Sequence, residues 1–472
     1  MEAAGAGDLV RVAVGKGLSP EKAMEIISKR PGVEFAEPNF QYTASFLSDD
    51  ALYTNGSLWG MYGGQPSPYD NQYGSHAAAV WGSAKNYVGS TKVGVGVIDT
   101  GIDYKHPDLY ENIWLNQTEI PGALKSKLVE TDGDGLITFR DLNASSNSAS
   151  VTDHNSNGYI DADDLLRDRR WIDRKDGNGT SVSKGGTANG YVDDLLGWNF
   201  VHNNNKPFDD NKHGTHVAGT IGAYSDPYSG PDTGVAGVNW NSQLVALKYL
   251  DSSGSGYTSN AVKAIDYFTN LSTAYKNLSP KVSFDFAVTN NSWGGGGFSQ
   301  SLLDAIVRGA KGADRTSKTA DDVLFVAAAG NGGSDQIGDN NDTTPNWPSN
   351  YNTTSGAGYD AVVAVAAIDQ YGRLAPWSNY GATTVDLAAP GVGIWSTVPN
   401  GGWASLNGTS MATPYVAGAV ALYSAYDPNA TAALVRDRLL ESTSDYLALD
   451  GRTATEGRLN IYNLFNDYYL LA

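Results

Sequence analysis

Short apolar runs alternate with amphipathic segments along most of the chain. The runs are rich in Val, Ile, Leu and Ala and are typical of parallel strands that are buried on both faces. The predicted strands are Val93 to Ile98, Leu244 to Leu247, Phe286 to Thr289, Val323 to Ala328 and Val362 to Ala366, and the predicted helices include Ala261 to Phe268 and Leu302 to Arg308. This alternation predicts an α/β fold built on a doubly wound parallel sheet.

The residues that precede this region have a pattern of their own. Leu9 to Val14 alternates like a strand, Ser19 is placed as the N-cap of an amphipathic helix, and Gly32 to Ala36 predicts a second strand. The pattern predicts a small β-α-β unit over residues 1–45 and one large domain over residues 46–472.

Composition narrows the class of protein. At 472 residues with 41% apolar side chains, the chain can bury a large core. Acidic residues outnumber basic ones by 51 to 32, and the net charge of −19 argues against nucleic acid as a partner and suits cations. The lack of cysteine excludes disulfides and zinc-thiolate sites. No apolar run is long enough to span a membrane, and Met1 to Gly5 lacks the features of a signal peptide.

The segment from Leu406 to Ala417 carries the first candidate for chemistry. Gly408 permits a close backbone approach before Ser410, and Pro414 is expected in the first turn of a helix, where a missing N–H has no cost. Ser410 is therefore predicted at a helix N-terminus. Its own N–H is free there to stabilise an anion that forms beside the side chain.

A serine hydroxyl becomes a strong nucleophile only when a base takes its proton and a carboxylate orients that base. Among six histidines, His213 opens the run His-Gly-Thr-His-Val-Ala-Gly-Thr, a loop that turns into a helix of small residues. Asp99 ends a predicted buried strand, and open α/β sheets place their sites at the carboxyl ends of strands. Asp99, His213 and Ser410 are thus the candidate catalytic group.

Three motifs occur in the same order: Asp-Thr-Gly from Asp99, His-Gly-Thr-His-Val-Ala-Gly from His213, and Gly-Thr-Ser-Met-Ala-Thr-Pro around Ser410. In this respect the sequence resembles the subtilisin-like serine proteases, the subtilases. The resemblance implies a subtilisin-like fold and a serine endopeptidase. Ser410 would be the nucleophile, His213 the general base and then acid, and Asp99 the group that orients the imidazole. Asn331, in Ala-Ala-Ala-Gly-Asn-Gly, would donate its amide to the oxyanion, and His216 would be structural.

The resemblance also implies where substrate and propeptide lie. Gly254, Ser255 and Gly256, together with Ser292, Trp293 and Gly294, match segments that pair with the substrate backbone as a strand. Asn346 would lie near the floor of the pocket for the residue before the cleaved bond, the P1 residue.

Pro31 to Phe40 looks like the end of a subtilase propeptide, so residues 1–45 would be a partial inhibitor that acts on its own chain, cut off between Phe40 and Asp50. Polypeptide substrates, a monomeric enzyme and an extracellular or periplasmic location are further expectations.

The long separation of Asp99 from His213 predicts an insertion over residues 110–200 that is rich in Asp and Asn. Two stretches in it, Glu130 to Asp141 and Asp153 to Asp164, fit a twelve-residue calcium loop, with oxygen ligands at positions 1, 3, 5 and 12 and Gly at position 6. Both have Asp at position 12, so they look more like dockerin-type loops than regulatory EF-hands. The candidate ligands are Glu130, Asp132, Asp134, Leu136 and Asp141 in the first loop, and Asp153, Asn155, Asn157, Tyr159 and Asp164 in the second.

Other calcium candidates are weaker. Asp108, in His-Pro-Asp, resembles a family residue that helps to bind structural calcium, but it could equally be a helix cap. A set of five further residues fits no single loop, so we expect no ion there; these are Asp173, Asp176, Asn178, Asp193 and Asp194. For the insertion as a whole, the alternative is a solvated acidic segment.

Two other functions stay open at this point. One is a catalytically silent, calcium-dependent binding module, which the complete catalytic group disfavours. The other is a peptide ligase or cyclase, in which an amine replaces water in attacking the acyl-enzyme. The sequence does not separate hydrolysis from ligation, because that choice depends on the access of water to the cleft.

Overall fold

The computed structural model describes residues 2–3, 10–11, 26–31, 33, 36, 47–64, 67–83, 87–175, 189–226, 234–276, 284–312, 314–319 and 321–466. The chain divides into two compact units, Met1–Ser45 and Phe46–Ala472. In the first unit, β1 (Glu2–Ala3) pairs antiparallel with β2 (Val10–Arg11), which falls inside the predicted first strand. The predicted helix after Ser19 and the second strand lie largely outside the described residues, so the β-α-β unit stays a prediction.

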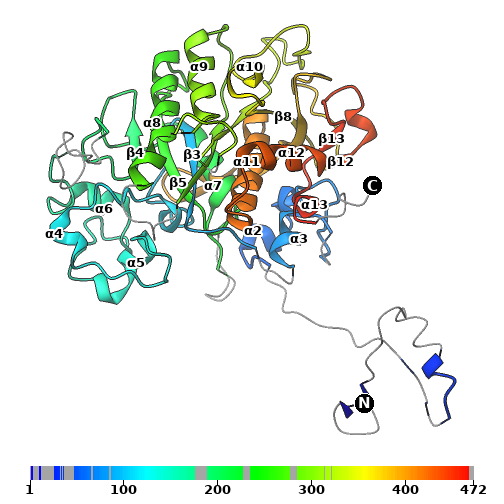
Figure 1. The fold of residues 1–472 in the computed structure, drawn as a ribbon, viewed down its shortest axis with the longest axis horizontal. Helices are drawn as coiled ribbons and strands as arrows, with labels where there is room; N and C mark the ends of the chain where they lie inside the picture. The colour runs from blue at the N-terminus through cyan, green and yellow to red at the C-terminus, as the bar shows by residue number, and fades with distance from the viewer. Residues whose placement is uncertain are drawn as a thin grey trace. The chain divides into compact units, whose positions relative to one another are not determined.

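One mixed sheet forms the centre of the second unit (Figure 1). Among the described residues it contains nine strands in the order β12-β13-β9-β8-β7-β6-β3-β5-β4, all pairs being parallel except β12 with β13. The strands are β3 (Val93–Asp99), β4 (Gly197–Asn199), β5 (Gln243–Lys248), β6 (Asp285–Asn291), β7 (Leu324–Ala328), β8 (Val362–Ile368), β9 (Leu387–Pro390), β12 (Ser444–Asp445) and β13 (Gly457–Arg458). The predicted doubly wound α/β fold is confirmed.

The direction of winding reverses at β3. The chain runs from β3 to β5 on one side of it and later returns to place β6 on the other side. Open α/β sheets bind ligands at such a switch point, outside the carboxyl ends of the strands. Asp99 is the last residue of β3, so it lies at this point.

Among the described residues, helices cover both faces of the sheet. Successive side chains of a strand point to opposite faces, and on β3 Val97 packs in one core with α7 (His213–Gly222) and α11 (Thr409–Tyr426). Its neighbour Ile98 packs in a second core with α8 (Thr258–Lys276) and α9 (Gln300–Gly309). Figure 1 shows α8 beside α9. Helices α7 and α11, which carry two of the candidate catalytic residues, thus lie on the same face.

Smaller elements complete the second unit. The remaining helices are α2 (Ala51–Thr54), α3 (Ala77–Trp81), α4 (Gly122–Lys125), α5 (Phe139–Asn143), α6 (Ala162–Arg167), α10 (Thr354–Ala357), α12 (Ala432–Glu441) and α13 (Ile461–Leu464), with short 3-10 turns at Trp59–Met61, Tyr110–Asn112, Ser145–Asn147 and Leu447–Leu449. A separate hairpin joins β10 (Ile394–Val398) to β11 (Gly402–Leu406) and leads into α11. Within the described residues, no helix has the length and apolarity needed to cross a membrane.

Candidate active site

Asp99 and His213 are in direct contact. The Asp99 side chain is fully buried, and its Oδ1 lies 2.8 Å from Nδ1 of His213, whose side chain is 28% exposed. Because an ionised carboxylate only accepts, this contact places a proton on Nδ1 and leaves Nε2 free to accept one. The pair therefore has the geometry of a base and the group that orients it.

A second carboxylate, that of Asp209, shapes the turn into α7, although Asp209 lies in no motif that indicates this role. Its oxygens accept hydrogen bonds from Thr100 Oγ1 at 2.8 Å and from the Thr215 hydroxyl at 2.6 Å. They also accept the backbone N–H groups of Asn211, Lys212 and Thr215. Asp209 thus ties the residue after Asp99 to the first turn of the helix that begins at His213.

The two histidines of α7 have opposite electrostatic surroundings. Burial disfavours the charged form of His213, but the attraction and hydrogen bond of Asp99, with a smaller contribution from Asp209, outweigh it and raise the pKa of His213. For His216, burial dominates and lowers the pKa to about 4. The ring of His216 donates from Nε2 to the carbonyls of Ile394 and Ala404. His216 therefore joins α7 to the β10–β11 hairpin, as a structural residue would.

Ser410 is the second residue of α11, so its N–H belongs to the first turn. Its hydroxyl donates to the carbonyl of Ser292 at 3.1 Å, and the Ser292 hydroxyl donates to the carbonyl of Ser410 at 2.9 Å. Ser292 and His213 line the same cleft, so the residue that bonds to the candidate nucleophile and the candidate base lie on one cleft.

The expected position of Pro414 is wrong in one respect. Pro414 lies inside α11, beyond the first turn that we expected. A proline at this position removes the N–H that would bond to the carbonyl four residues earlier, that of Ser410. That carbonyl is satisfied instead by the hydroxyl of Ser292. The helix tolerates Pro414 because a side chain from outside the helix replaces the missing donor.

Asn331 lies in the loop after β7 and contacts the start of α11. Its Oδ1 accepts the backbone N–H of Thr409 at 2.8 Å and the Thr409 hydroxyl at 2.9 Å. A backbone N–H can only donate, so it fixes the oxygen of the amide toward Thr409. The NH₂ group of Asn331, an exposed residue, is therefore directed away from Thr409.

Both predicted substrate segments line one cleft of about 510 Å³. The lining includes Gly254, Ser255 and Gly256 of the first segment, Ser292 to Gly296 around the second, and His213. Asn346 lies beside the second segment, because a Cβ added to Gly294 would be 3.2 Å from the amide nitrogen of Asn346. The structure thus brings Asn346 next to the substrate segments, although it does not line the cleft itself.

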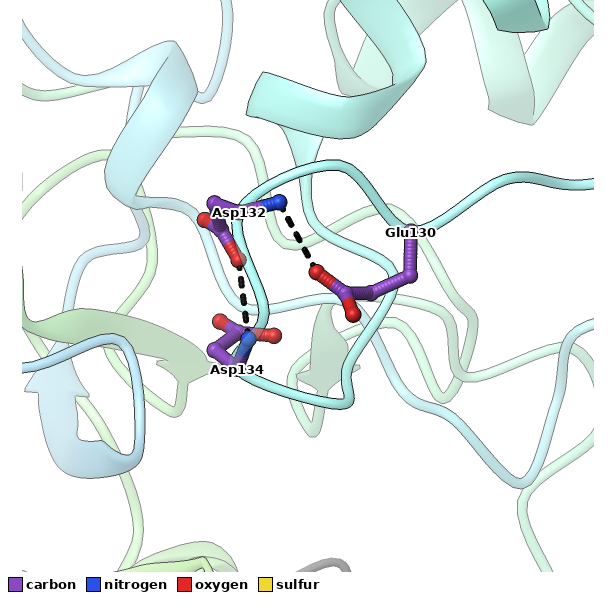
Figure 2. A group of neighbouring side chains, drawn as sticks. All are labelled: Glu130, Asp132 and Asp134. Atoms are coloured by element: carbon purple, nitrogen blue, oxygen red, sulfur yellow. Dashed lines mark hydrogen bonds between the residues drawn. The ribbon is translucent and has the colours of Figure 1, made fainter.

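The first predicted calcium loop brings three carboxylates together (Figure 2). Glu130, Asp132 and Asp134 each offer an oxygen within 4.8 Å of the others. Burial raises the pKa of Asp132 to about 6, with further contributions from the negative charges of Asp134 and Asp141 and from a side-chain hydrogen bond with Glu130. Gly135, at position 6, has a φ of +83°, as the sharp turn of such a loop requires. Leu136, at position 7, is buried.

The second loop repeats this design with amides in place of two carboxylates. Asp153 accepts the N–H of Gly158, which has a φ of +95° at position 6. Asn155 and Asn157 donate their amide nitrogens to Asp161. Tyr159, at position 7, donates its hydroxyl to the carbonyl of Lys105 at 2.8 Å.

Position 12 has the same role in both loops. Asp141 accepts the N–H groups of Thr131 and Thr138, and Asp164 accepts those of His154 and Asp161. Each aspartate thereby completes the capping box of the helix that follows its loop, α5 or α6. The two loops are thus built alike even though their sequences differ.

The weaker calcium candidates are engaged elsewhere. Asp108 is buried and accepts the indole N–H of Trp403 at 2.7 Å and the N–H of Val235 at 2.9 Å. Asp193 accepts the backbone N–H groups of Asp173 and Arg174, and Asp194 accepts from Asn116, Asn189 and Tyr267. Asp176 and Asn178 lie outside the described residues.

Comparison with known proteins finds one matching family model and several similar serine proteinases. The family model described as "Subtilase family" matches residues 90–461. A thermophilic serine proteinase of Bacillus sp. (strain AK1) is 29% identical over 94% of this chain and 75% of its own length. Subtilisin DY of Bacillus licheniformis is 38% identical over 53% of this chain and 76% of its own length. The solved structure of a cold adapted subtilisin-like serine proteinase covers 86% of this chain and 97% of its own at 24% identity, with a TM-score of 0.49.

The fold is a parallel sheet that changes its direction of winding at β3, and the cleft is lined by the histidine that contacts Asp99. The match over residues 90–461 places the chain in the subtilase family. It is a serine endopeptidase of the subtilisin type.

Proposed function

We propose that Asp99, His213 and Ser410 form the catalytic triad and that Asn331 contributes to the oxyanion hole. The observation that carries this is the 2.8 Å contact of buried Asp99 with His213, in a cleft whose wall residue Ser292 binds Ser410. A triad member alone would be an ordinary cap or turn residue. The three residues together can activate a serine hydroxyl, which none of them can do alone.

In the reaction, Ser410 Oγ attacks the carbonyl carbon of the substrate while its proton passes to Nε2 of His213. The electron pair of the C=O bond moves to the oxygen, and the NH₂ of Asn331 and the N–H of Ser410 stabilise the oxyanion. When the intermediate collapses, the C–N bond breaks and His213 gives its proton to the leaving amine. Water, activated by His213, then cleaves the ester.

A fluorophosphonate probe tests this assignment on the intact protein. Peptide mapping of the labelled enzyme should find one phosphonylated residue, Ser410, because only an activated serine reacts at a useful rate. Labelling at another serine would refute the triad. Product masses after incubation with a peptide and excess amine separate hydrolysis, which we propose, from ligation.

We propose further that the two loops hold calcium. All ligand atoms would be carboxylate, amide or carbonyl oxygens, which Ca²⁺ prefers, and the three clustered carboxylates of the first loop repel one another unless a cation offsets their charge. The ions would be held by Glu130, Asp132, Asp134, Leu136 and Asp141 in one loop and by Asp153, Asn155, Asn157, Tyr159 and Asp164 in the other. A bound ion supplies positive charge that stabilises the folded insertion, and no catalytic step passes through it. Asp108 stays a candidate ligand only.

Calcium should therefore stabilise the wild type more than a variant with Asp132→Asn and Asp134→Asn. At a hundredfold excess over Kd, one site contributes about 2.7 kcal/mol to the free energy of unfolding. The wild type should gain several degrees of melting temperature on adding calcium, measured by scanning calorimetry, and the variant clearly less.

The matched control for this experiment is Asp437→Asn with Asp450→Asn, which makes the same change in charge at exposed positions. It should respond to calcium like the wild type. If the loop variant also responds like the wild type, the first loop is not a calcium site.

The remaining assignments follow the family. Substrate polypeptides would pair with Gly254–Gly256 and with Ser292–Gly294, with the P1 side chain approaching Asn346. Residues 1–45 would act as a partial propeptide in cis. We also infer a monomeric enzyme that works outside the cytoplasm.

A further inference from the structure

Asn331 is carried by a loop whose backbone has little stiffness of its own. Gly330 and Gly332 flank it, with φ values of +111° and +69°. Glycine changes backbone region at low cost, so it does not by itself hold one conformation. The position of Asn331 therefore depends on the groups that bond to its neighbours. Thr409 donates to the side-chain oxygen of Asn331. Of the backbone groups next to Asn331, the Thr409 hydroxyl contacts the N–H of Gly330, at 3.3 Å.

Two buried asparagines hold the loop on both sides of Asn331. Asn379, 4% exposed, accepts the N–H of Gly332 on its Oδ1 at 2.8 Å and donates its own backbone N–H to the Gly330 carbonyl at 2.9 Å. Asn341, fully buried, donates its Nδ2 to the carbonyl of Ala329 at 2.9 Å. The two side chains are joined by a 3.0 Å hydrogen bond from Asn379 Nδ2 to Asn341 Oδ1.

The orientations of the Asn379 and Asn341 side-chain amides are fixed by backbone groups that can only donate or only accept a hydrogen bond. Asn379 Oδ1 faces two backbone N–H groups, those of Gly332 and Asp339, which can only donate. Asn341 Nδ2 faces a backbone carbonyl, which can only accept. If either amide were rotated by 180°, a donor would face a donor or an acceptor would face an acceptor. Both side chains are buried, and a hydrogen bond that is not formed in a buried place is costly. The pair is thus a rigid support for a loop that lacks rigidity.

We propose that Asn379 and Asn341 form an amide brace that positions Asn331 for oxyanion stabilisation. This rests on the proposed role of Asn331 as oxyanion donor. The brace residues bond to Ala329, Gly330 and Gly332, and they act on the reaction only through Asn331. They are positioning residues, which the sequence pattern did not reveal because they come from two loops distant from the catalytic motifs.

The test is Asn379→Asp, which keeps the size of the side chain. In this variant one carboxylate oxygen can still accept the N–H of Gly332. The other oxygen faces Asn341 Oδ1, so two acceptors that repel each other replace the hydrogen bond between the two side chains. We expect kcat to fall roughly 10- to 100-fold, as for a small misplacement of a catalytic group, with little change in KM. Asn341→Asp, which opposes the carbonyl of Ala329 in the same way, should act alike.

Rates are expressed per active site, counted by titration with a fluorophosphonate, so that misfolded protein does not enter kcat. A role in stability alone would lower the melting temperature or the active fraction and leave this kcat unchanged, which would overturn the proposal. Asn199→Asp is the matched control. Asn199 is also buried, accepts two backbone N–H groups and donates to a carbonyl, but it lies on β4. Its kcat should stay at the wild-type value.

A double-mutant cycle with Asn331→Ala decides the route of action. Loss of the oxyanion donor alone should lower kcat roughly 10²- to 10³-fold. If the brace acts through Asn331, adding Asn379→Asp to this variant should cost almost nothing more. If the fold-losses in kcat of the two single variants multiply in the double variant, the brace is overturned and the oxyanion role of Asn331 is kept. An unchanged kcat for Asn331→Ala alone would overturn both.

Discussion

Ser410→Ala should lower kcat about 10⁶-fold. The substitution removes the only atom of the proposed triad that bonds to substrate, and His213 and Asp99 have no nucleophile to activate without it. KM should change little, because the segments that line the cleft are untouched. The measurement is the steady-state hydrolysis of a chromogenic peptide, with enough variant enzyme to detect a residual rate.

The control is Ser405→Ala, the same chemical change at an exposed position on β11. It should keep wild-type kcat. A residual activity of Ser410→Ala within about a hundredfold of the wild type would mean that another group performs the attack.

Asp99→Asn should lower kcat on the order of 10⁴-fold. An amide can present its NH₂ to Nδ1 of His213, which moves the ring proton to Nε2, the atom that must accept from Ser410. The shape of the site is kept, so the loss reports the protonation of the ring. Asp266→Asn, which removes a carboxylate bonded to Arg308 on the α8–α9 face, should leave kcat unchanged.

The same variant should change the pH profile in a defined direction. His213 acts as a base only when neutral, so kcat/KM falls as the pH drops through its pKa. In the wild type Asp99 raises that pKa, so the fall should begin above the pH expected for an ordinary imidazole. Without the charge of Asp99 the fall should move to lower pH. A profile that stays in place would show that Asp99 does not set the pKa of His213.

The parallel sheet could be predicted from sequence because its strands are buried on both faces. Val93 to Ile98 and Val362 to Ala366 are continuous apolar runs, and the structure extends them by only one and two residues, to Asp99 and Ile368. The hairpin of β10 and β11 was missed, since its strands mix polar and apolar residues and β11 is only partly buried.

The candidate site was predictable only where a residue lies in a local motif. Asp99 ends an apolar strand and His213 starts a helix of small residues, so each has a pattern around it. Asp209, Asn341 and Asn379 have no such pattern, because their partners come from distant parts of the chain. The place of Pro414 was misjudged for the same reason. The hydroxyl that replaces its missing donor belongs to Ser292, 118 residues before Ser410.

The order of the chain bears on when the proposed triad can assemble, because β3 lies between β5 and β6 in the sheet. Asp99 reaches its final surroundings only after β5 and β6 have paired on its two sides. Ser410 joins the site later, through contacts with residues more than a hundred positions earlier. Contacts over such distances form slowly, because a long loop must close before they stabilise anything. A growing chain that still lacks α11 also lacks Ser410, so the proposed nucleophile is among the last parts of the site to be made.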